Sequence, residues 1–147
     1  MNLVEIQGDL FSTLQEDKEY CYVQCISADL KMGKGIALDF NKNFNSKGEL
    51  GNRRTKIKWD DAGFCLKQRD NVYHLITKGK YWEKPTYRTI RESLIDFKQA
   101  VLMYQIKDVA MPKIGCGLDN LHWDKVKTII ENLFGDTNVN FYVYYLE

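Results

Sequence analysis

The sequence predicts an α/β domain in three layers, with helices on both faces of a mixed sheet. Strand-like apolar runs and amphipathic segments alternate over much of the 147-residue chain, which is the pattern of α/β proteins. Two segments have apolar residues at helical spacing. Hydrophobic residues make up 44% of the chain and charged residues 28%, the balance of an ordinary globular domain.

Four short apolar runs in the first half are predicted strands: Leu3–Gln7, Cys21–Ile26, Phe64–Gln68 and Val72–Thr77. The second is rich in residues that suit a buried sheet. Three residues separate the last two runs, which is the spacing of a hairpin. A loop over residues 27–35 follows the second strand, and a helical pattern begins at Ile36.

The second half of the chain continues the alternation. Pro85 and Thr86 open the clearest helix, whose apolar residues recur at helical spacing: Ile90, Leu94, Phe97 and Val101. A short buried strand over Asp108–Met111 is expected to end at Pro112. The next helix has one apolar stripe made of Val126, Ile129, Ile130 and Leu133. A final strand is predicted over residues 140–146.

Composition restricts the class of protein. A formal charge of +1 argues against a protein that coats nucleic acid or membrane through bulk charge. No apolar run reaches the ~20 residues that span a bilayer, and the first residues lack the features of a signal peptide. The four cysteines show no close-paired pattern, as expected for reduced thiols in the cytoplasm. We therefore expect one cytoplasmic domain over residues 1–147.

Two glycine-containing loops follow predicted strands, over residues 27–35 and 112–119. Glycine lets backbone N–H groups approach an anion, and a helix N-terminus adds favourable partial charge. Ligands of open α/β sheets lie at the carboxyl ends of strands, where both loops would sit. The glycine spacing alone fits ordinary tight turns equally well.

Three polar residues at predicted strand ends are candidates for chemistry. Lys78 follows a buried strand, where partial desolvation favours the neutral, nucleophilic amine. Asp119 closes the second glycine loop and could move protons. Asp9 could accept a hydrogen bond from a base. Taken singly, Lys78 fits a solvated strand-end lysine and Asp9 fits a helix cap better than a functional role, and Asp119 also fits a turn residue.

Other chemistries have weaker support. Cys116 could be a nucleophile with His74 or His122 as base, but no family signature surrounds it. The cysteines and histidines lack zinc-ligand spacing. Between residues 42 and 58, six bases face one acid, Glu49, and Trp59 follows: Lys42, Lys47, Arg53, Arg54, Lys56 and Lys58. This run could follow a phosphate backbone or form a solvated helix face.

Taken together, these segments resemble a macrodomain, specifically the terminal ADP-ribose protein glycohydrolase branch. They are also similar to the macrodomain of bacterial antitoxins that remove ADP-ribose from DNA. The matching stretches cover residues 7–11, 25–29, 32–37, 75–78, 84–87 and 111–119, followed by Leu121 and Trp123. They occur in matching order over essentially the whole domain.

The resemblance implies a macrodomain-type three-layer α/β/α fold with a mixed, roughly six-stranded sheet and ADP-ribose across the strand ends. It places Asp9 and Leu10 at the adenine end, Leu146 near the adenosine and Ser27 by the distal ribose. Two loops would hold the diphosphate through Met32, Gly33, Gly35 and Ile36, and through Lys113, Ile114, Gly115, Cys116, Gly117 and Leu118.

The same resemblance makes Lys78 the nucleophile on the anomeric carbon of the distal ribose and Asp119 the acid/base, with no metal and no cofactor. The commoner hydrolytic macrodomains have an asparagine-rich loop and a glycine run where this chain has residues 26–29 and 33–35. A mechanism based on their water-positioning asparagine is therefore not expected. Residues 79–83 have no clear counterpart.

The resemblance implies a hydrolase that removes ADP-ribose from glutamate or aspartate of proteins, or from nucleobases of DNA. We also expect a monomer that has no membrane partner. Two alternatives stay open. A binding module would hold ADP-ribose without cleaving it, and a phosphatase would act on ADP-ribose 1″-phosphate. The basic run over residues 42–58 leans towards nucleic acid.

Overall fold

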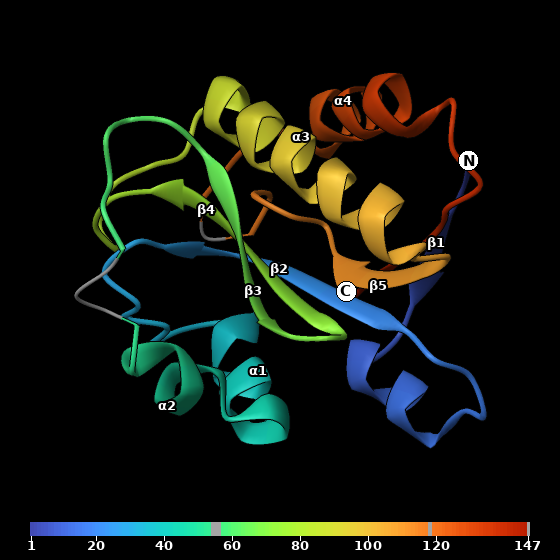
Figure 1. Ribbon diagram of the computed structural model, residues 1–147, viewed down its shortest axis with the longest axis horizontal. Coiled ribbons are helices and arrows are strands. Elements are labelled where there is room, and N and C mark those ends of the chain that lie inside the picture. The colour runs from blue at the N-terminus through green and yellow to red at the C-terminus, as the bar shows by residue number, and fades with distance from the viewer. Residues whose placement is uncertain (54–56, 118, 147) are drawn as a thin grey trace.

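A computed structural model describes residues 1–53, 57–117 and 119–146 of the chain. A six-stranded sheet runs through the middle of the molecule in the order β1-β6-β5-β2-β4-β3 (Figure 1). The strands are β1 (Asn2–Gln7), β2 (Cys21–Ser27), β3 (Phe64–Arg69), β4 (Val72–Lys78), β5 (Asp108–Pro112) and β6 (Asn140–Tyr145). All neighbours are parallel except β3, which pairs antiparallel with β4.

Helices cover both faces of this sheet, so the predicted three-layer arrangement is confirmed. Helices α3 (Tyr87–Tyr104) and α4 (Trp123–Phe134) lie on one face. A 3-10 helix, η1 (Leu10–Gln15), lies on the other face with α1 (Ile36–Phe44) and α2 (Ser46–Gly51) (Figure 1). In the described chain no helix is long and apolar enough to cross a membrane.

The apolar stripes read from the sequence face the sheet. All four predicted core positions of α3 are at most 3% exposed: Ile90, Leu94, Phe97 and Val101. On α4, Val126 and Ile130 are buried, and Phe134 joins them. A capping box starts α3, in which Thr86 Oγ1 accepts from Thr89 N at 3.1 Å and Thr89 Oγ1 accepts from Thr86 N at 3.0 Å. The helix therefore begins where the sequence predicted.

Helix α2 was not predicted, since two of its six residues are glycine, the poorest helix former after proline. Tertiary contacts stabilise it instead. Leu50 is fully buried, and Glu49 accepts from Gln68 Nε2 at 3.0 Å and pairs with Arg69. The predicted hairpin of β3 and β4 is present, so the strand that closes this side of the sheet also holds α2.

Candidate functional site

The strand order changes direction between β2 and β5, and we refer to the position outside the carboxyl ends of these two strands as the crevice. After β2 the chain crosses to β3 and β4 on one side, whereas after β5 it crosses to β6 on the other. Such a topological switch point is where open α/β sheets bind ligands. The described ladder pairs of β2 and β5 are limited to Cys21–Val109 and Tyr22–Ala110, near their amino ends. The two strands therefore separate towards their carboxyl ends, where both glycine loops begin.

A β-bulge positions Lys78 at this crevice. The β2–β4 register runs from Ile26–Ile76 directly to Ser27–Lys78, which leaves Thr77 without a ladder partner on β2. Bulges re-aim the side chains that follow them. The Lys78 Nζ atom lies 2.6 Å from Asp119 Oδ1, and the two side chains are 13% and 17% exposed. The structure thus brings the two candidate catalytic residues into direct contact, 41 positions apart in the chain.

Cysteine thiols beside this pair stay protonated. Burial, followed by the Asp119 carboxylate, raises the pKa of Cys25 well above its usual range. Burial also raises the pKa of Cys116 to about 11, and its Sγ lies 3.2 Å from the Ile114 carbonyl oxygen. A neutral thiol is a poor nucleophile. We therefore interpret Cys116 as a packing residue and not as a nucleophile.

Ser27 lies directly beside Lys78 and is held by Asp29. Its hydroxyl donates to Asp29 Oδ1 at 2.5 Å, and the same oxygen accepts from Lys31 N at 3.1 Å. The other oxygen, Oδ2, accepts from Tyr81 N at 3.0 Å. Burial works against the charged form, but these hydrogen bonds outweigh it and keep the pKa of Asp29 below its usual value. Asp29 therefore joins the loop after β2 to the turn after β4.

The loop over residues 27–35 has a special backbone conformation. Leu30, Met32 and Gly35 all have positive φ, at 58°, 43° and 61°. Met32 is 5% exposed and its side chain belongs to the core, whereas Gly33 and Gly35 are exposed. Gly35 is the N-cap of α1 and supplies no side chain to it. The first turn of α1, starting at the half-buried Ile36, therefore has no capping side chain for its backbone amides, and uncapped amides at a helix N-terminus favour an anion.

The second loop uses its two glycines differently. Gly115 has φ 72°, and an added Cβ would lie 3.1 Å from Leu121 Cδ1 and 3.2 Å from Ile90 Cδ1, so packing requires this glycine. At Gly117 an added Cβ would meet no atom within 4 Å. Nothing within the described protein demands glycine there, which is the situation expected where a ligand approaches the backbone. Leu118 lies outside the described residues.

The other residues of this loop lie close to β1 and β6. Ile114 is 1% exposed and belongs to the core. The Lys113 Nζ atom lies 4.3 Å from the Tyr145 ring centroid and 3.6 Å from Glu5 Oε1. Lysine 113 therefore connects the loop after β5 to strands β1 and β6.

The ends of β1 and β6 bring Asp9, Leu10 and Leu146 into one region, because Gly8 N donates to Tyr145 O at 2.9 Å. Asp9 caps η1 by accepting from Phe11 N at 3.0 Å, so its reading as a helix cap is confirmed. Leu10 is 3% exposed and packs in the core, whereas Leu146 is 79% exposed. The described contacts do not join this region to Lys78 directly.

The remaining candidates have structural roles. His74 is buried between two glutamines, with Nδ1 3.1 Å from Gln24 Nε2 and Nε2 2.8 Å from Gln68 Oε1. Burial, with a smaller effect of Arg53, lowers the pKa of His74 to about 3. Arg53 itself donates to the carbonyl oxygens of Lys67 and Gln68. It is thus occupied within the fold, and Arg54 and Lys56 lie outside the described residues.

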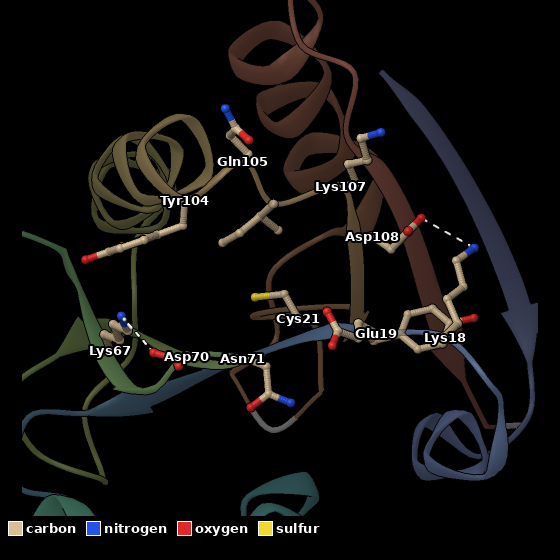
Figure 2. Close-up of a pocket in the computed structure, with 12 residues that line it drawn as sticks. Lys18, Glu19, Cys21, Lys67, Asp70, Asn71, Tyr104, Gln105, Lys107 and Asp108 are labelled. Carbon is tan, nitrogen blue, oxygen red and sulfur yellow. Dashed lines mark ion pairs between the residues drawn. The ribbon is translucent and has the colours of Figure 1, made fainter.

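A hollow of about 450 Å³ lies at the opposite edge of the sheet, and Figure 2 shows the residues that line it. It is lined by residues that precede or begin strands, such as Asn71 and Asp108, and by the end of α3. None of the predicted site residues lines it. The hollow is therefore separate from the crevice, and its size does not identify the site.

Asp29 is the residue of this site that sequence reasoning missed. Its spacing from Ser27 is local, but its contact with Tyr81 spans 52 residues and depends on the pairing of β2 with β4. The signal was the position of Asp29 two residues after the strand-end serine and two residues before Lys31, within the loop over residues 27–35. That pattern also fits an ordinary Asx-turn.

Solved structures show which known fold this chain has. Superposition on the macrodomain of Mycobacterium tuberculosis DarG gives a TM-score of 0.79 at 23% identity, covering 97% of this chain and 96% of that one. The macrodomain of Thermus aquaticus DarG gives 0.78 at 22% identity, covering 97% of each chain. Thermosipho africanus DarTG in complex with ADP-ribose gives 0.76 at 19% identity, covering 99% of this chain and 42% of that one. The fold is that of a macrodomain.

Curated relatives narrow the class to a family, although no family model matches the sequence. The chain is 41% identical over 143 residues to the Bos taurus protein named ADP-ribose glycohydrolase OARD1, and 38% identical to its Homo sapiens counterpart. Both alignments cover 96% of this chain and 90% of the relative. The chain belongs to the OARD1 family of macrodomains, in agreement with the resemblance seen in its motifs.

Proposed function

We propose that this protein is an ADP-ribosyl glycohydrolase that releases ADP-ribose from modified macromolecules. The observation that carries the proposal is the contact of Lys78 Nζ with Asp119 Oδ1 at 2.6 Å, largely shielded from water. It lies where the separating strands β2 and β5 open the crevice. The names of the OARD1 relatives support the same activity.

ADP-ribose is proposed to lie along the carboxyl edge of the sheet. Asp9, Leu10 and Leu146 would hold its adenosine end. Its diphosphate would meet the N-terminus of α1 and the exposed backbone of Gly117, which favour an anion. Ser27, beside Lys78, would contact the distal ribose. The anomeric carbon would then lie within reach of the Lys78 amine, and this positioning supplies several kcal/mol of rate acceleration.

The chemistry starts with a proton transfer within the pair. An ion-paired ammonium has no free lone pair, so a proton moves from Lys78 Nζ to Asp119 before attack. The amine then forms a bond to the anomeric carbon while the bond to the leaving group breaks. A carboxylate leaves with the electron pair and needs no proton, so Asp119 passes its proton to solvent and is again ionised. A nucleobase nitrogen receives its proton from the protonated Asp119.

Hydrolysis of the lysine adduct completes the cycle. The ribose ring then opens as Asp119 transfers one proton from the adduct nitrogen to the ring oxygen. The bond from the anomeric carbon to the ring oxygen breaks and leaves a protonated imine, a linkage that lysine amines form with carbonyl carbons. Asp119 removes a proton from water as the water adds to the imine carbon, and returns it to the departing Lys78 nitrogen. The products are free ADP-ribose and regenerated enzyme. Every group that moves a proton in this scheme belongs to the described chain.

The buried pair distinguishes this proposal from a binding module, because holding ADP-ribose does not require an amine and a carboxylate in contact out of water. Burying a charged pair is costly and is seldom retained for stability alone. A phosphatase acting on ADP-ribose 1″-phosphate would release phosphate and leave modified protein intact.

The test measures free ADP-ribose released from a glutamate-modified protein by the wild type, Lys78→Ala and Asp119→Asn. We expect turnover to be lost in the first variant and strongly reduced in the second, with ADP-ribose affinity within a few-fold of wild type. Denaturation midpoints confirm that each variant folds. Retained turnover in both variants would overturn the mechanism. Binding without release by the wild type would make the protein a reader, and phosphate release alone would make it a phosphatase.

The setting of the activity belongs to the same proposal. We infer a monomeric single domain, residues 1–147, acting on ADP-ribosylated protein or DNA in the cytoplasm. All four cysteines are free thiols, which suits a reducing compartment. Gel filtration with light scattering tests the monomer, and fractionation of cells that express the protein tests the compartment.

A further inference from the structure

The turn that follows Lys78 is held rigidly by its backbone. Gly79 O accepts from Asp29 N at 3.1 Å, and Tyr81 N donates to Asp29 Oδ2 at 3.0 Å. Within the turn, Glu83 Oε1 accepts from Lys80 N at 2.6 Å and Glu83 N donates to Lys80 O at 3.0 Å. A Cβ at Gly79 would lie 2.7 Å from Trp59 Cδ1 and 2.8 Å from Glu83 Oε1. The turn is therefore pre-organised, and Trp59 and Glu83 pack tightly against its first residue.

Two aromatic side chains project from this turn into solvent. Tyr81 is 51% exposed and Trp82 is 65% exposed, and their rings meet edge to face with centroids 5.1 Å apart. Large aromatics contribute most to stability when buried, so neither is needed in this position for the core. Trp82 is four positions after Lys78 in the chain, which limits the distance between their Cα atoms to about 14 Å. The pair thus stands at the rim of the proposed active site.

The rim is also basic. The loop over residues 27–35 and the turn over residues 79–84 contain four lysines and two acids. Both acids are engaged in hydrogen bonds to backbone amides of these segments, Asp29 with Lys31 and Tyr81 and Glu83 with Lys80. The Lys31 ammonium lies 5.6 Å from the Tyr81 ring centroid. Cationic and aromatic groups are therefore interleaved on one surface.

We propose that Tyr81 and Trp82 form a stacking platform for the bases of a single-stranded nucleic acid that carries the ADP-ribose. Aromatic platforms beside lysines are how proteins bind single strands without reading sequence, because every base has a flat face and every linkage a phosphate. This inference rests on the proposed function, since Lys78 must act on the base-linked sugar while the neighbouring bases lie on the platform.

A modified peptide fits the rim less well. An acidic peptide would use the lysines, but it brings no flat rings to match two exposed aromatics. The exposed and rigid presentation of Trp82 suits a partner that stacks, since little conformational entropy is lost when a pre-organised ring is covered.

The experiment compares three substrates that carry the same ADP-ribose group. One is a single-stranded oligonucleotide of about ten residues with one modified base, a length within the usual range of single-strand sites. The second is the same modified base as a nucleoside, and the third is a glutamate-modified peptide. We expect kcat/KM to be at least tenfold higher for the oligonucleotide than for the nucleoside, and this advantage to fall as salt increases.

Three variants assign that advantage to the platform. Trp82→Ala should remove most of it, a loss of about tenfold or more for one base–aromatic contact, with turnover of the nucleoside unchanged. Trp82→Phe should keep most of it. Tyr104→Ala removes an aromatic residue of similar exposure, 52%, at the other edge of the sheet and should change nothing. Denaturation midpoints confirm the fold of each variant.

The outcomes separate the two proposals. If none of the three substrates is cleaved, the proposed function fails. If the nucleoside and the peptide are cleaved through Lys78 but the oligonucleotide is no better than the nucleoside, only the platform is refuted. A preference for the peptide that depends on Trp82 would assign the rim to protein substrates and overturn the inference as well.

Discussion

The central sheet has a carboxyl edge, where its parallel strands end, and an amino edge, where they begin. Both edges carry a lysine–aspartate pair, but the two pairs differ in how far they are shielded from water. At the carboxyl edge, Lys78 meets Asp119 at 2.6 Å with both side chains at most 17% exposed. At the amino edge, Lys67 meets Asp70 at 3.4 Å, and the Asp70 side chain is fully in solvent. The amino edge has the hollow of about 450 Å³, yet no glycine lines it. Shielded charge and accessible backbone, rather than hollow volume, therefore distinguish the edge that carries the proposed site from an ordinary surface.

The largest expected difference between the edges is in turnover. Lys78→Ala should lower kcat by about a thousandfold or more, because the nucleophile is lost. Lys67→Ala, the matched change at the amino edge, should leave kcat within twofold of wild type. Release of ADP-ribose under saturating substrate measures both. Equal effects of the two variants on kcat would show that the carboxyl edge is no more important for turnover than the amino edge.

His74, which is buried in the sheet between the two edges, should make the stability of the protein depend on pH. The folded pKa of His74 is about 3 against a usual 6.5, so the unfolded chain takes up a proton before the folded protein does. The contribution of His74 to stability is fully present above pH 6.5 and declines as pH falls towards 3, by about 4–5 kcal/mol at most. Urea denaturation at several pH values measures it.

His74→Gln is the informative control for this acid sensitivity. It should be less stable than the wild type at pH 7, since it breaks a buried hydrogen-bonded chain, but its stability should fall less between pH 6.5 and 4. The exposed His122 offers a matched change, His122→Gln, which should retain the wild-type pH profile. An unchanged slope in His74→Gln would assign the acid sensitivity to other groups.

At the carboxyl edge, substitutions of two glycines in the loop after β5 should affect different properties, one ligand binding and the other stability. Gly117→Ala should weaken ADP-ribose binding about tenfold and leave stability within about 0.5 kcal/mol, because its Cβ meets no protein atom. Gly115→Ala should lower stability by about 1–2 kcal/mol, since its φ is 72° and its Cβ would crowd Leu121. Calorimetric titration and thermal denaturation measure the two effects. Gly117→Ala binding as tightly as wild type would remove this loop from the ligand site.

The smallest predicted effects are at the two ends of α3, which connects the edges. Thr86→Ala, at the carboxyl edge, removes the capping box and should cost about 1 kcal/mol of stability. Gln105→Gly, at the amino edge, should gain up to about 1 kcal/mol, because Gln105 ends the helix with φ 54°. Chemical denaturation of both variants measures whether the free energy of unfolding falls or rises in each. A loss in Gln105→Gly would show that its side chain matters more than its backbone strain.

The sequence predicted the strands and helices well, but it did not predict which candidate residues contact one another. Strands and the two long helices follow from local patterns of apolar residues, so Ile90 and Val126 were placed in the core correctly. Candidate residues Lys78 and Asp119 were found because each ends a recognisable segment. Their contact depends on strand order and on the bulge at Thr77, neither of which is encoded locally. The resemblance to macrodomains, and not spacing, supplied that arrangement.

Features stabilised by distant contacts escaped prediction for the same reason. Helix α2 depends on the burial of Leu50 and on pairing of Glu49 with Arg69. The turn after Lys78 depends on Asp29, across 52 residues. Arg53 was counted in a basic run, but it donates to two carbonyls of β3. A charged or polar residue thus reveals its role only when its partners are known.

The pairing of β1 with β6 has a consequence for the order of assembly. Asn2 lies in register with Asn140, and the N-terminal ammonium donates to Thr137 O at 2.7 Å. Closing a loop of this length carries a large entropic cost and slows the contact that completes it. Both β1 and β6 lead directly into the proposed adenosine end, at Asp9 and Leu146. The proposed adenosine end therefore depends on a pairing that spans almost the whole described chain, whereas the contact of Lys78 with Asp119 spans 41 residues.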